Sequence, residues 1–424
     1  MRANVIHTDL NPCGGAEQLA LGTIHALIEM DIDVELTTAR MPDISRLKNA
    51  FGDERVGTLF SQIRKINLLG KLPIGVNNEA TIKECDNQDA NKKECKNDII
   101  INTHGDVLPY FLPSFSRRTT ITYCHFPVAI VPINSRDLSY LRYLANQGLV
   151  DNEILNSDPQ TLSEFWYKLR QHYLLMLKNS LVITNSNFSK IAIMKTLESS
   201  KFATNEQPLI IQPPVNVEEF RKAALFSAER SDHILVISRI HPSKRLENAI
   251  NLARILKQNK IGDGMVIAGS LLDDDCFAND YYHKIIDMIR AFKLSDFVTI
   301  EINVGLARLK SLMRNSKAYF HPLPGEPFGI SIVEAMSAGL IPAVPNIGGH
   351  TEVVPKKYQF NSLKAAAGVV LSALSVAQDE RIRVSNTVLN ISLSQYALLL
   401  QRVIKTMLTI TINELPPISK EQLV

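Results

Sequence analysis

The sequence predicts an α/β protein made of two domains, each with a parallel sheet. Short apolar runs alternate with helical patterns from end to end, as expected for βαβ units. The chain has 424 residues, more than one hydrophobic core usually spans. The strand series also restarts after the pair Pro213-Pro214, which can continue neither a sheet nor a helix. A domain boundary is therefore expected at this point.

The first domain is expected over residues 1–213. Its predicted strands are 3–8, 33–38, 98–103, 119–124 and 180–185. The helix after the first strand has an apolar face formed by Ala20, Ile24, Leu27 and Ile28. Residues 76–98 are polar and rich in Asn, Lys, Glu and Asp, which indicates a solvated insertion. Cys85 and Cys95 lie in this insertion without further soft ligands nearby, so a metal clip is not expected.

The second domain is expected over residues 214–393. Its predicted strands are 233–238, 264–270, 296–301, 317–322 and 340–345. A helical apolar stripe follows, formed by Tyr396, Leu399, Leu400, Val403, Ile404 and Met407. We expect this C-terminal helix, within residues 394–424, to cross back over both domains and to join the first one.

Composition and charge exclude several functional classes. Lys and Arg number 46 against 43 Asp and Glu, so the net charge of +3 does not favour nucleic acid as a partner. The five cysteines are widely spread and form no CxxC pair, which favours a reduced, cytoplasmic setting. The chain shows neither a signal-peptide pattern nor an apolar run of membrane-spanning length. Any membrane contact is therefore expected to be peripheral.

Ligands of open α/β sheets bind beyond the carboxyl ends of the strands, so the residues that follow each strand are the candidate site residues. Arg239 and Lys244 are predicted in the loop and at the helix start after strand 233–238, where two cations can neutralise a diphosphate. His125 follows strand 119–124 and can bind a hydroxyl or move a proton. Gly14 and Gly15 allow close approach of the backbone to a ligand. Taken singly, each has an ordinary structural explanation: an exposed basic loop, a structural histidine and a capping turn.

The strongest signal lies in the segment HPLPGEPFGISIVE, residues 321–334. Glu326 lies in the loop after a predicted strand, and Glu334 lies about one turn into the helix that Gly329 opens. The backbone N–H groups of Phe328, Gly329 and Ile330 are expected to be free for phosphate or sugar oxygens. An amphipathic helix with an acidic first turn explains Glu334 but not the glycine turn.

Two further acidic features receive less weight. Glu352 is predicted at a helix start, where a carboxylate suits the helix dipole in any case. The run Asp273, Asp274 and Asp275 could bind Mg²⁺ or Mn²⁺, but a solvated loop with a helix cap is the favoured interpretation.

In combination, GGAE, HFP, RIHPSK and EPFGISIVE resemble glycosyltransferase family 4, in the expected order along nearly the whole chain. The resemblance implies the GT-B fold, in which two Rossmann-like domains face each other and the second holds the nucleotide sugar. It also implies retaining hexosyl transfer without a metal. Within the family, the motifs are most similar to mannosyltransferases that extend lipid-linked oligosaccharides at the cytosolic membrane face.

The resemblance also implies roles for individual residues. Arg239 and Lys244 match the pair that binds the donor diphosphate. Glu326 matches the carboxylate that contacts the donor sugar, and Glu334 matches the one that holds the ribose hydroxyls. His125 and Gly15 match the histidine beside the transferred sugar and the close-approach glycine of the first turn. No other cofactor is implied, because the nucleoside-diphosphate sugar is a co-substrate.

The acceptor, a glycan or a lipid-linked sugar, is expected on the first domain. The segment 157–180 is predicted as a helix with Asp158 as N-cap, in which aromatic residues such as Trp166 alternate with basic ones. This helix could lie on an anionic membrane, or its aromatic stripe could be core. Two other functions stay open for the whole chain, a non-hydrolysing sugar-nucleotide epimerase and a silent nucleotide-sugar binding module. An NAD-dependent oxidoreductase is disfavoured because no GxGxxG motif is present.

Overall fold

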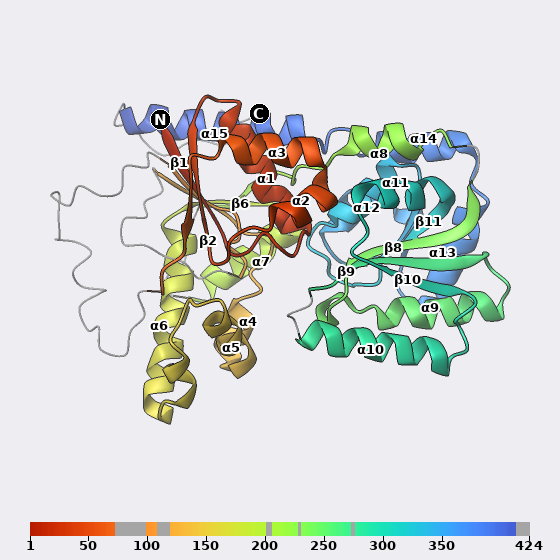
Figure 1. Ribbon diagram of the computed structural model, residues 1–424, viewed down its shortest axis with the longest axis horizontal. Coiled ribbons are helices and arrows are strands. Elements are labelled where there is room, and N and C mark those ends of the chain that lie inside the picture. The colour runs from red at the N-terminus through yellow and green to blue at the C-terminus, as the bar shows by residue number, and fades with distance from the viewer. Residues whose placement is uncertain (73–98, 108–118, 201–205, 228–229, 273–275, 413–424) are drawn as a thin grey trace.

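The computed structural model describes residues 1–72, 99–107, 119–200, 206–227, 230–272 and 276–412. They form two α/β domains that lie side by side, the first at the left and the second at the right of Figure 1. The predicted insertion 76–98, the run Asp273–Asp275 and residues 413–424 lie outside the described residues.

Each domain contains a parallel sheet, which confirms the predicted fold class. The first sheet has seven strands in the order β3-β2-β1-β4-β5-β6-β7, and the second has six in the order β10-β9-β8-β11-β12-β13. The strands of the first sheet are β1 Arg2–His7, β2 Asp33–Thr38, β3 Lys65–Leu68, β4 Ile99–Asn102, β5 Thr120–Tyr123, β6 Leu181–Thr184 and β7 Leu209–Ile210. Those of the second are β8 Ser231–Arg239, β9 Gly264–Ser270, β10 Val298–Ile302, β11 Ser316–Phe320, β12 Ile341–Pro345 and β13 Gln359–Phe360.

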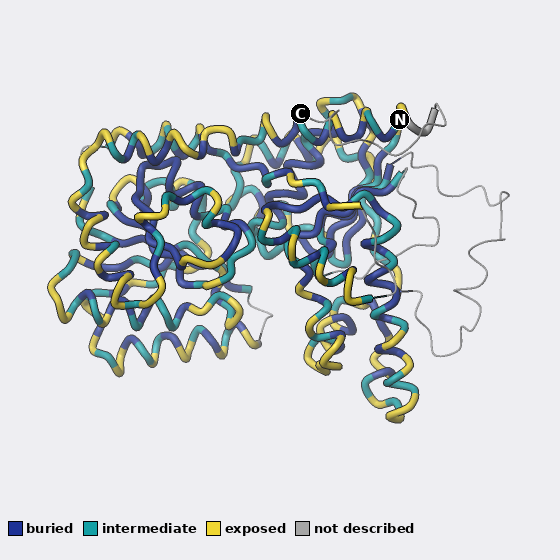
Figure 2. Tube along the Cα trace, turned by 180° about the vertical axis from the view of Figure 1, so that it is seen from behind, coloured by how far each residue is buried: buried dark blue, intermediate teal, exposed yellow. Residues whose placement is uncertain are grey.

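Helices cover both sheets. The first sheet carries α1 Gly15–Ile28, α2 Ile44–Phe51, α3 Asp53–Gln62, α4 Ile130–Ser135, α5 Leu138–Asn146, α6 Pro159–Lys178 and α7 Asn187–Glu198. The second carries α8 Val217–Ala224, α9 Glu247–Gln258, α10 Cys276–Ala291, α11 Leu306–Asn315, α12 Ile330–Ser337, α13 Leu363–Leu374 and α14 Gln378–Asn386, and the described chain ends with α15 Leu393–Ile412. Buried residues gather in the strands and along the inner helix faces of both domains, as Figure 2 shows.

The central strands are apolar because both of their faces are buried. In the first domain, Val5 of β1 is paired with Leu36 of β2 on one side and Ile101 of β4 on the other, and all three are buried. In the second domain, Ile234 of β8 is paired with Met265 of β9 in the same way. These continuous apolar runs are the pattern from which the strands were predicted.

The C-terminal helix α15 packs on the first domain, where it runs beside α1 (Figure 1). Its predicted stripe joins the first domain's core, with Leu399 only partly buried. The hydroxyl groups of Thr23 and Tyr396 are hydrogen-bonded at 2.7 Å across this contact. The main contact of α15 is thus with the first domain, whereas α14 packs on α12 in the second.

The aromatic stripe of α6 is core rather than a membrane surface. The helix begins at Pro159 with Asp158 as its N-cap, as predicted. Phe165, Trp166 and Tyr173 are all at most 5% exposed and pack in one cluster with α4 and α5. Burial of this stripe removes the argument that it lies on lipid. Within the described residues, the helices include none with the length and apolarity needed to cross a bilayer.

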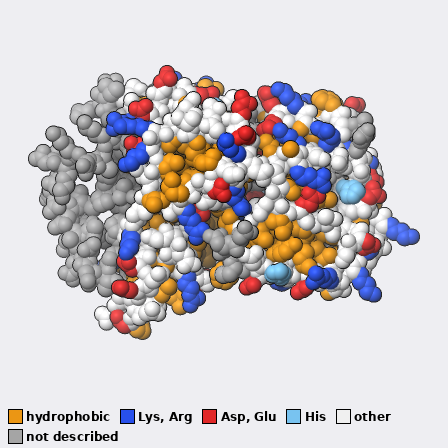
Figure 3. Space-filling view, viewed as in Figure 1, with side chains coloured by type: hydrophobic (Ala, Val, Ile, Leu, Met, Phe, Trp, Pro, Cys, Tyr) orange, Lys and Arg blue, Asp and Glu red, His pale blue; other side chains and the backbone are white. Residues whose placement is uncertain are grey.

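Charges of both signs are interspersed on the visible described surface, and no single basic field covers this face (Figure 3). This distribution agrees with the net charge of +3. A polyanion would find no continuous positive surface on this face.

We expect the Tyr396→Phe substitution to lower the free energy of unfolding of the first domain by about 1–2 kcal/mol, because Thr23 loses a buried hydrogen-bond partner. Trp166, the only tryptophan of the chain, lies in this domain and reports its urea transition by fluorescence. Leu398→Ala is the matched control on α15, since Leu398 is exposed. Equal urea midpoints for Tyr396→Phe and wild type would contradict the packing of α15 on α1.

Candidate active site between the two domains

The loop between β11 and α12 carries the strongest sequence signal, and glycine fixes its shape. Gly325 and Gly329 have φ values of +77° and +90°, a conformation that other residues rarely adopt. A Cβ atom on Gly329 would also lie 2.4 Å from Ile332 Cδ1. Gly329 is the N-cap of α12, and Glu334 lies one turn into that helix, as predicted.

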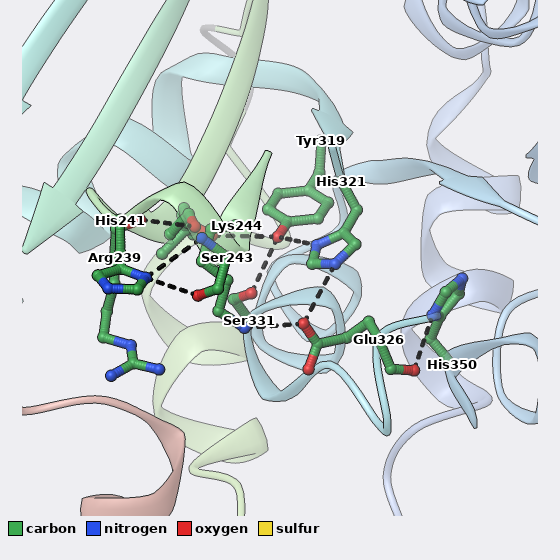
Figure 4. Close-up of polar contacts among 11 residues, drawn as sticks. Arg239, His241, Ser243, Lys244, Tyr319, His321, Glu326, Ser331 and His350 are labelled. Atoms are coloured by element: carbon green, nitrogen blue, oxygen red, sulfur yellow. Dashed lines mark hydrogen bonds and ion pairs between the residues drawn. The ribbon is translucent and has the colours of Figure 1, made fainter. Parts of the chain in front are cut away.

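Glu326 in this loop forms an ion pair with Lys244. Lys244 Nζ donates to Glu326 Oε2 at 2.9 Å, and the two side chains are 23% and 13% exposed (Figure 4). Burial alone would raise the pKa of Glu326, but the positive charge of Lys244 and the hydrogen bond from His321 outweigh burial and lower it. Glu326 is therefore a carboxylate at neutral pH.

Three residues that were not predicted as site residues form a chain of polar contacts that ends at Glu326. His321 Nε2 lies 3.5 Å from Glu326 Oε2, and the Tyr319 hydroxyl lies 3.3 Å from His321 Nδ1 and 2.9 Å from Ser331 Oγ (Figure 4). Since His321 directly follows β11, the strand-end rule that selected His125 could also have selected it.

Arg239 and Lys244 occupy other positions than predicted. Arg239 is the last residue of β8 rather than a loop residue, and Lys244 ends a one-turn 3₁₀ helix, Pro242–Lys244, that precedes α9. The strand is longer than the apolar run because its polar last residues still pair with β9. In Figure 4 the Arg239 side chain extends away from the Lys244–Glu326 pair. Its guanidinium makes no hydrogen bond or ion pair with any described residue.

The N-termini of α1 and α12 face each other across the domains. A Cβ atom on Gly15 would lie 2.9 Å from Ile330 Cδ1, and one on Gly14 would lie 3.8 Å from Arg239 Cδ. The N–H groups of Phe328, Gly329 and Ile330 have no partner among the described residues, as predicted. The N-terminus of α12 thus keeps its N–H groups open, with Lys244 beside the loop that leads into it and Arg239 beside Gly14 of the first domain, whereas the N–H of Gly14 already donates to Glu17. This place between the domains suits a diphosphate.

Glu334 is buried at the same interface. It is 9% exposed, and burial raises its pKa to about 8, with the negative charge of Glu219 acting in the same direction. A hydrogen bond with Gln18 of α1 and the charge of Arg55 oppose the rise. In the unliganded protein Glu334 is thus mostly protonated at neutral pH, and it contacts the first domain.

His125 follows β5 as predicted, and its ring lies 4.9 Å from that of Tyr123. Burial lowers the pKa of His125 to about 4, and the neighbouring His7 acts in the same direction. The negative charges of Glu17 and Glu326 oppose this, which places His125 near groups of both domains. His125 is an uncharged imidazole at neutral pH.

The Glu352 side chain is directed to α7 and not to the proposed diphosphate site at the N-terminus of α12. It ends a 3₁₀ helix, Gly349–Glu352, instead of starting an α-helix, and its carboxylate accepts from the N–H groups of Asn187 and Phe188 at 3.1 and 3.0 Å. It therefore caps α7 of the first domain. Next to it, Ser186 Oγ donates to the carbonyl oxygen of Pro327 at 2.8 Å, so this contact also fixes the loop that bears Glu326.

No three His, Cys, Asp or Glu side chains of the described ranges are grouped so that they could hold a metal ion. The carboxylates of the site are paired with cations or lie against the other domain.

Comparison with known proteins agrees with the two-domain α/β fold. Residues 217–373 match the family model of glycosyl transferases group 1, which bears out the resemblance stated from the sequence for the second domain. Two solved structures are similar over 96% of this chain: a glycosyltransferase from Rickettsia africae (98% of that chain, TM-score 0.61, 15% identity) and Anabaena Alr3699/HepE in complex with UDP and glucose (100% of that chain, TM-score 0.60, 16% identity). At these identities the likeness concerns the fold.

Curated relatives are similar over shorter stretches. A GDP-Man:Man(3)GlcNAc(2)-PP-Dol alpha-1,2-mannosyltransferase of Neurospora crassa is 23% identical over 272 residues, 59% of this chain and 48% of that protein. A GDP-mannose:cellobiosyl-diphosphopolyprenol alpha-mannosyltransferase of Komagataeibacter xylinus is 28% identical over 173 residues, 41% of this chain and 40% of that protein. The matched stretches thus span less than half of either relative.

The protonated state of Glu334 predicts a pH dependence of stability. The folded protein keeps a proton up to about pH 8 that an unfolded chain releases near 4.5, so the contribution of Glu334 to stability falls as the pH rises from 4.5 to 8. We expect the melting temperature of wild type, relative to Glu334→Gln, to fall across this range. Glu54→Gln on the exposed surface of α3 is the control and should keep the wild-type profile. A constant difference between wild type and Glu334→Gln would show that Glu334 is not buried as a neutral acid.

Proposed function

We propose that this chain is a retaining glycosyltransferase that moves a hexose from a nucleoside-diphosphate sugar to a glycan or lipid-linked acceptor. The observation that carries the proposal is the Lys244–Glu326 ion pair beside two helix N-termini at the domain interface. Such a place supplies cations and N–H donors for a diphosphate and a carboxylate for sugar hydroxyls.

GDP-mannose is the donor that we propose first. The names of both relatives compared above include GDP-mannose as donor. In this chain, the diphosphate would lie against Arg239, Lys244 and the N–H groups of Phe328 to Ile330. Glu326 would then accept from hydroxyls of the hexose, and Glu334, once deprotonated, from the ribose.

The transfer is proposed as a front-face substitution. The bond between the anomeric carbon and the diphosphate oxygen breaks, and its electron pair leaves with the diphosphate. The acceptor oxygen forms the new bond on the same face, and its proton passes to the departing phosphate oxygen. Arg239 and Lys244 stabilise the charge that develops on the leaving group, so these side chains do the work that a metal does in other transferases. We therefore propose that no metal is required.

We propose that the protein meets its acceptor at a membrane surface, which it contacts peripherally. The names of the two relatives include the lipid carriers PP-Dol and diphosphopolyprenol. A lipid-linked acceptor would present its sugar to the place between the domains while its lipid stays in the bilayer, and we propose the cytosolic face as the place of action.

The proposed donor is tested by incubating the purified protein with UDP-, GDP- and ADP-sugars and following release of the nucleoside diphosphate. We expect GDP-mannose to give the fastest release, with retention at the anomeric carbon of the product. Interconversion of the sugar without release would instead indicate an epimerase, and tight binding without either would indicate a silent binding module.

We expect Lys244→Ala to reduce turnover at least about 100-fold, roughly 2.7 kcal/mol of transition-state stabilisation, because the leaving diphosphate loses its cation. The same fall is expected for Glu326→Gln. Lys257→Ala is the matched control, because Lys257 is paired with Asp296 on the surface of the same domain. A folded Lys244→Ala protein with the turnover of wild type would reject the assignment.

A further inference from the structure

A second polar cluster lies on the first domain, where the central strands β1, β4 and β5 end. It consists of His7, Glu17, His104, Asp106 and His125. The rings of His7 and His104 are stacked, with centroids 4.5 Å apart and planes at 7°. His7 Nδ1 lies 3.0 Å from Thr103 Oγ1, and His7 Nε2 lies 3.5 Å from Glu17 Oε1. Only His125 was selected from the sequence.

The cluster contains more polar atoms than it satisfies. His104 Nδ1, Asp106 Oδ1 and His125 Nε2 are shielded from solvent and have no hydrogen-bond partner among the described residues. An unsatisfied buried polar atom costs about 1–3 kcal/mol, and such atoms are rare in folded proteins. Three of them at one sheet edge indicate a place prepared for a polar ligand.

The cluster faces the proposed donor place. The positive charge of Arg239, at the end of β8, acts on the pKa values of Glu17, His104 and Asp106. The negative charge of Glu326 acts on that of His125. Gly14, whose N–H donates to Glu17, would carry a Cβ atom 3.8 Å from Arg239 Cδ, so these side chains lie on the first domain's side of the reaction centre.

The charge state of the cluster decides which ligand fits. Burial lowers the pKa of His104 well below its ordinary value and that of His125 to about 4, so both rings are uncharged. Burial raises the pKa of Asp106 to about 7, whereas Glu17 stays ionised. A phosphate would be repelled by these carboxyl groups, and the described residues form no metal-binding group. Neutral imidazoles and a carboxyl group that donate and accept suit sugar hydroxyls.

We propose that His104 and Asp106 form the subsite that binds hydroxyl groups of the acceptor's terminal sugar, and that this sugar is a neutral hexose rather than a phosphorylated one. His7 and Glu17 are positioning residues, because His7 stacks on His104 and is held by Glu17. The inference rests on the proposed function, since it places the acceptor opposite the donor. A lipid diphosphate attached to the acceptor would lie outside this subsite.

The test uses methyl α-D-mannopyranoside as the probe sugar and saturation-transfer NMR on the full chain with GDP present. We expect the sugar to bind wild type, and its affinity to fall at least about fivefold in Asp106→Ala and in His104→Phe, the loss expected for one hydrogen bond. His104→Phe keeps a ring to stack on His7 while it removes both nitrogens. His172→Phe, the same substitution at a buried histidine of α6, is the control and should bind like wild type.

GDP affinity is measured in parallel by calorimetry, and both cluster variants should bind GDP like wild type. The inference is overturned if wild type gives no saturation transfer, if the variants bind the sugar as wild type does, or if they lose GDP and sugar equally. Displacement of the sugar by inorganic pyrophosphate at saturating GDP also overturns it, because an anion would then occupy the subsite. Wild type that binds the sugar but not GDP supports the subsite and contradicts the proposed donor.

Discussion

The arrangement of the site depends on the ion pair between Lys244 and Glu326. Both side chains are largely removed from water, so each charge needs a partner, and loss of one partner of a buried pair costs about 3–5 kcal/mol. In the unliganded protein they satisfy each other. A nucleotide sugar offers both of them a replacement, since its diphosphate can pair with Lys244 and its hydroxyls can donate to Glu326. The pair therefore holds the charges in place without closing the site to a donor.

The residues of the site come from both domains. The second domain supplies Lys244, Glu326 and the N-terminus of α12, and the first supplies the N-terminus of α1 and the polar cluster around His104. Glu352 caps α7 across the interface, and Ser186 Oγ donates to the carbonyl oxygen of Pro327 in the loop between β11 and α12. Movement of one domain against the other would therefore also move the loop that bears Glu326.

The sequence predicted the fold class and most strands, because parallel strands buried on both faces read as apolar runs. It also predicted the turn at Gly329, since few other residues tolerate that backbone conformation. The cluster of His7, His104 and Asp106 was missed, because its members come from separate strand ends and only the pairing of β1 with β4 brings them together. The contact of Glu352 with α7 was missed for a similar reason, since it depends on how the domains meet.

The most direct test of the account is a crystal structure of the protein with GDP-mannose. We predict that the diphosphate lies between the N-termini of α1 and α12, in contact with Arg239 and Lys244, and that Glu326 releases Lys244 to accept from the mannose. A complex in which the Lys244–Glu326 pair stays at 2.9 Å while the diphosphate binds elsewhere would contradict the account.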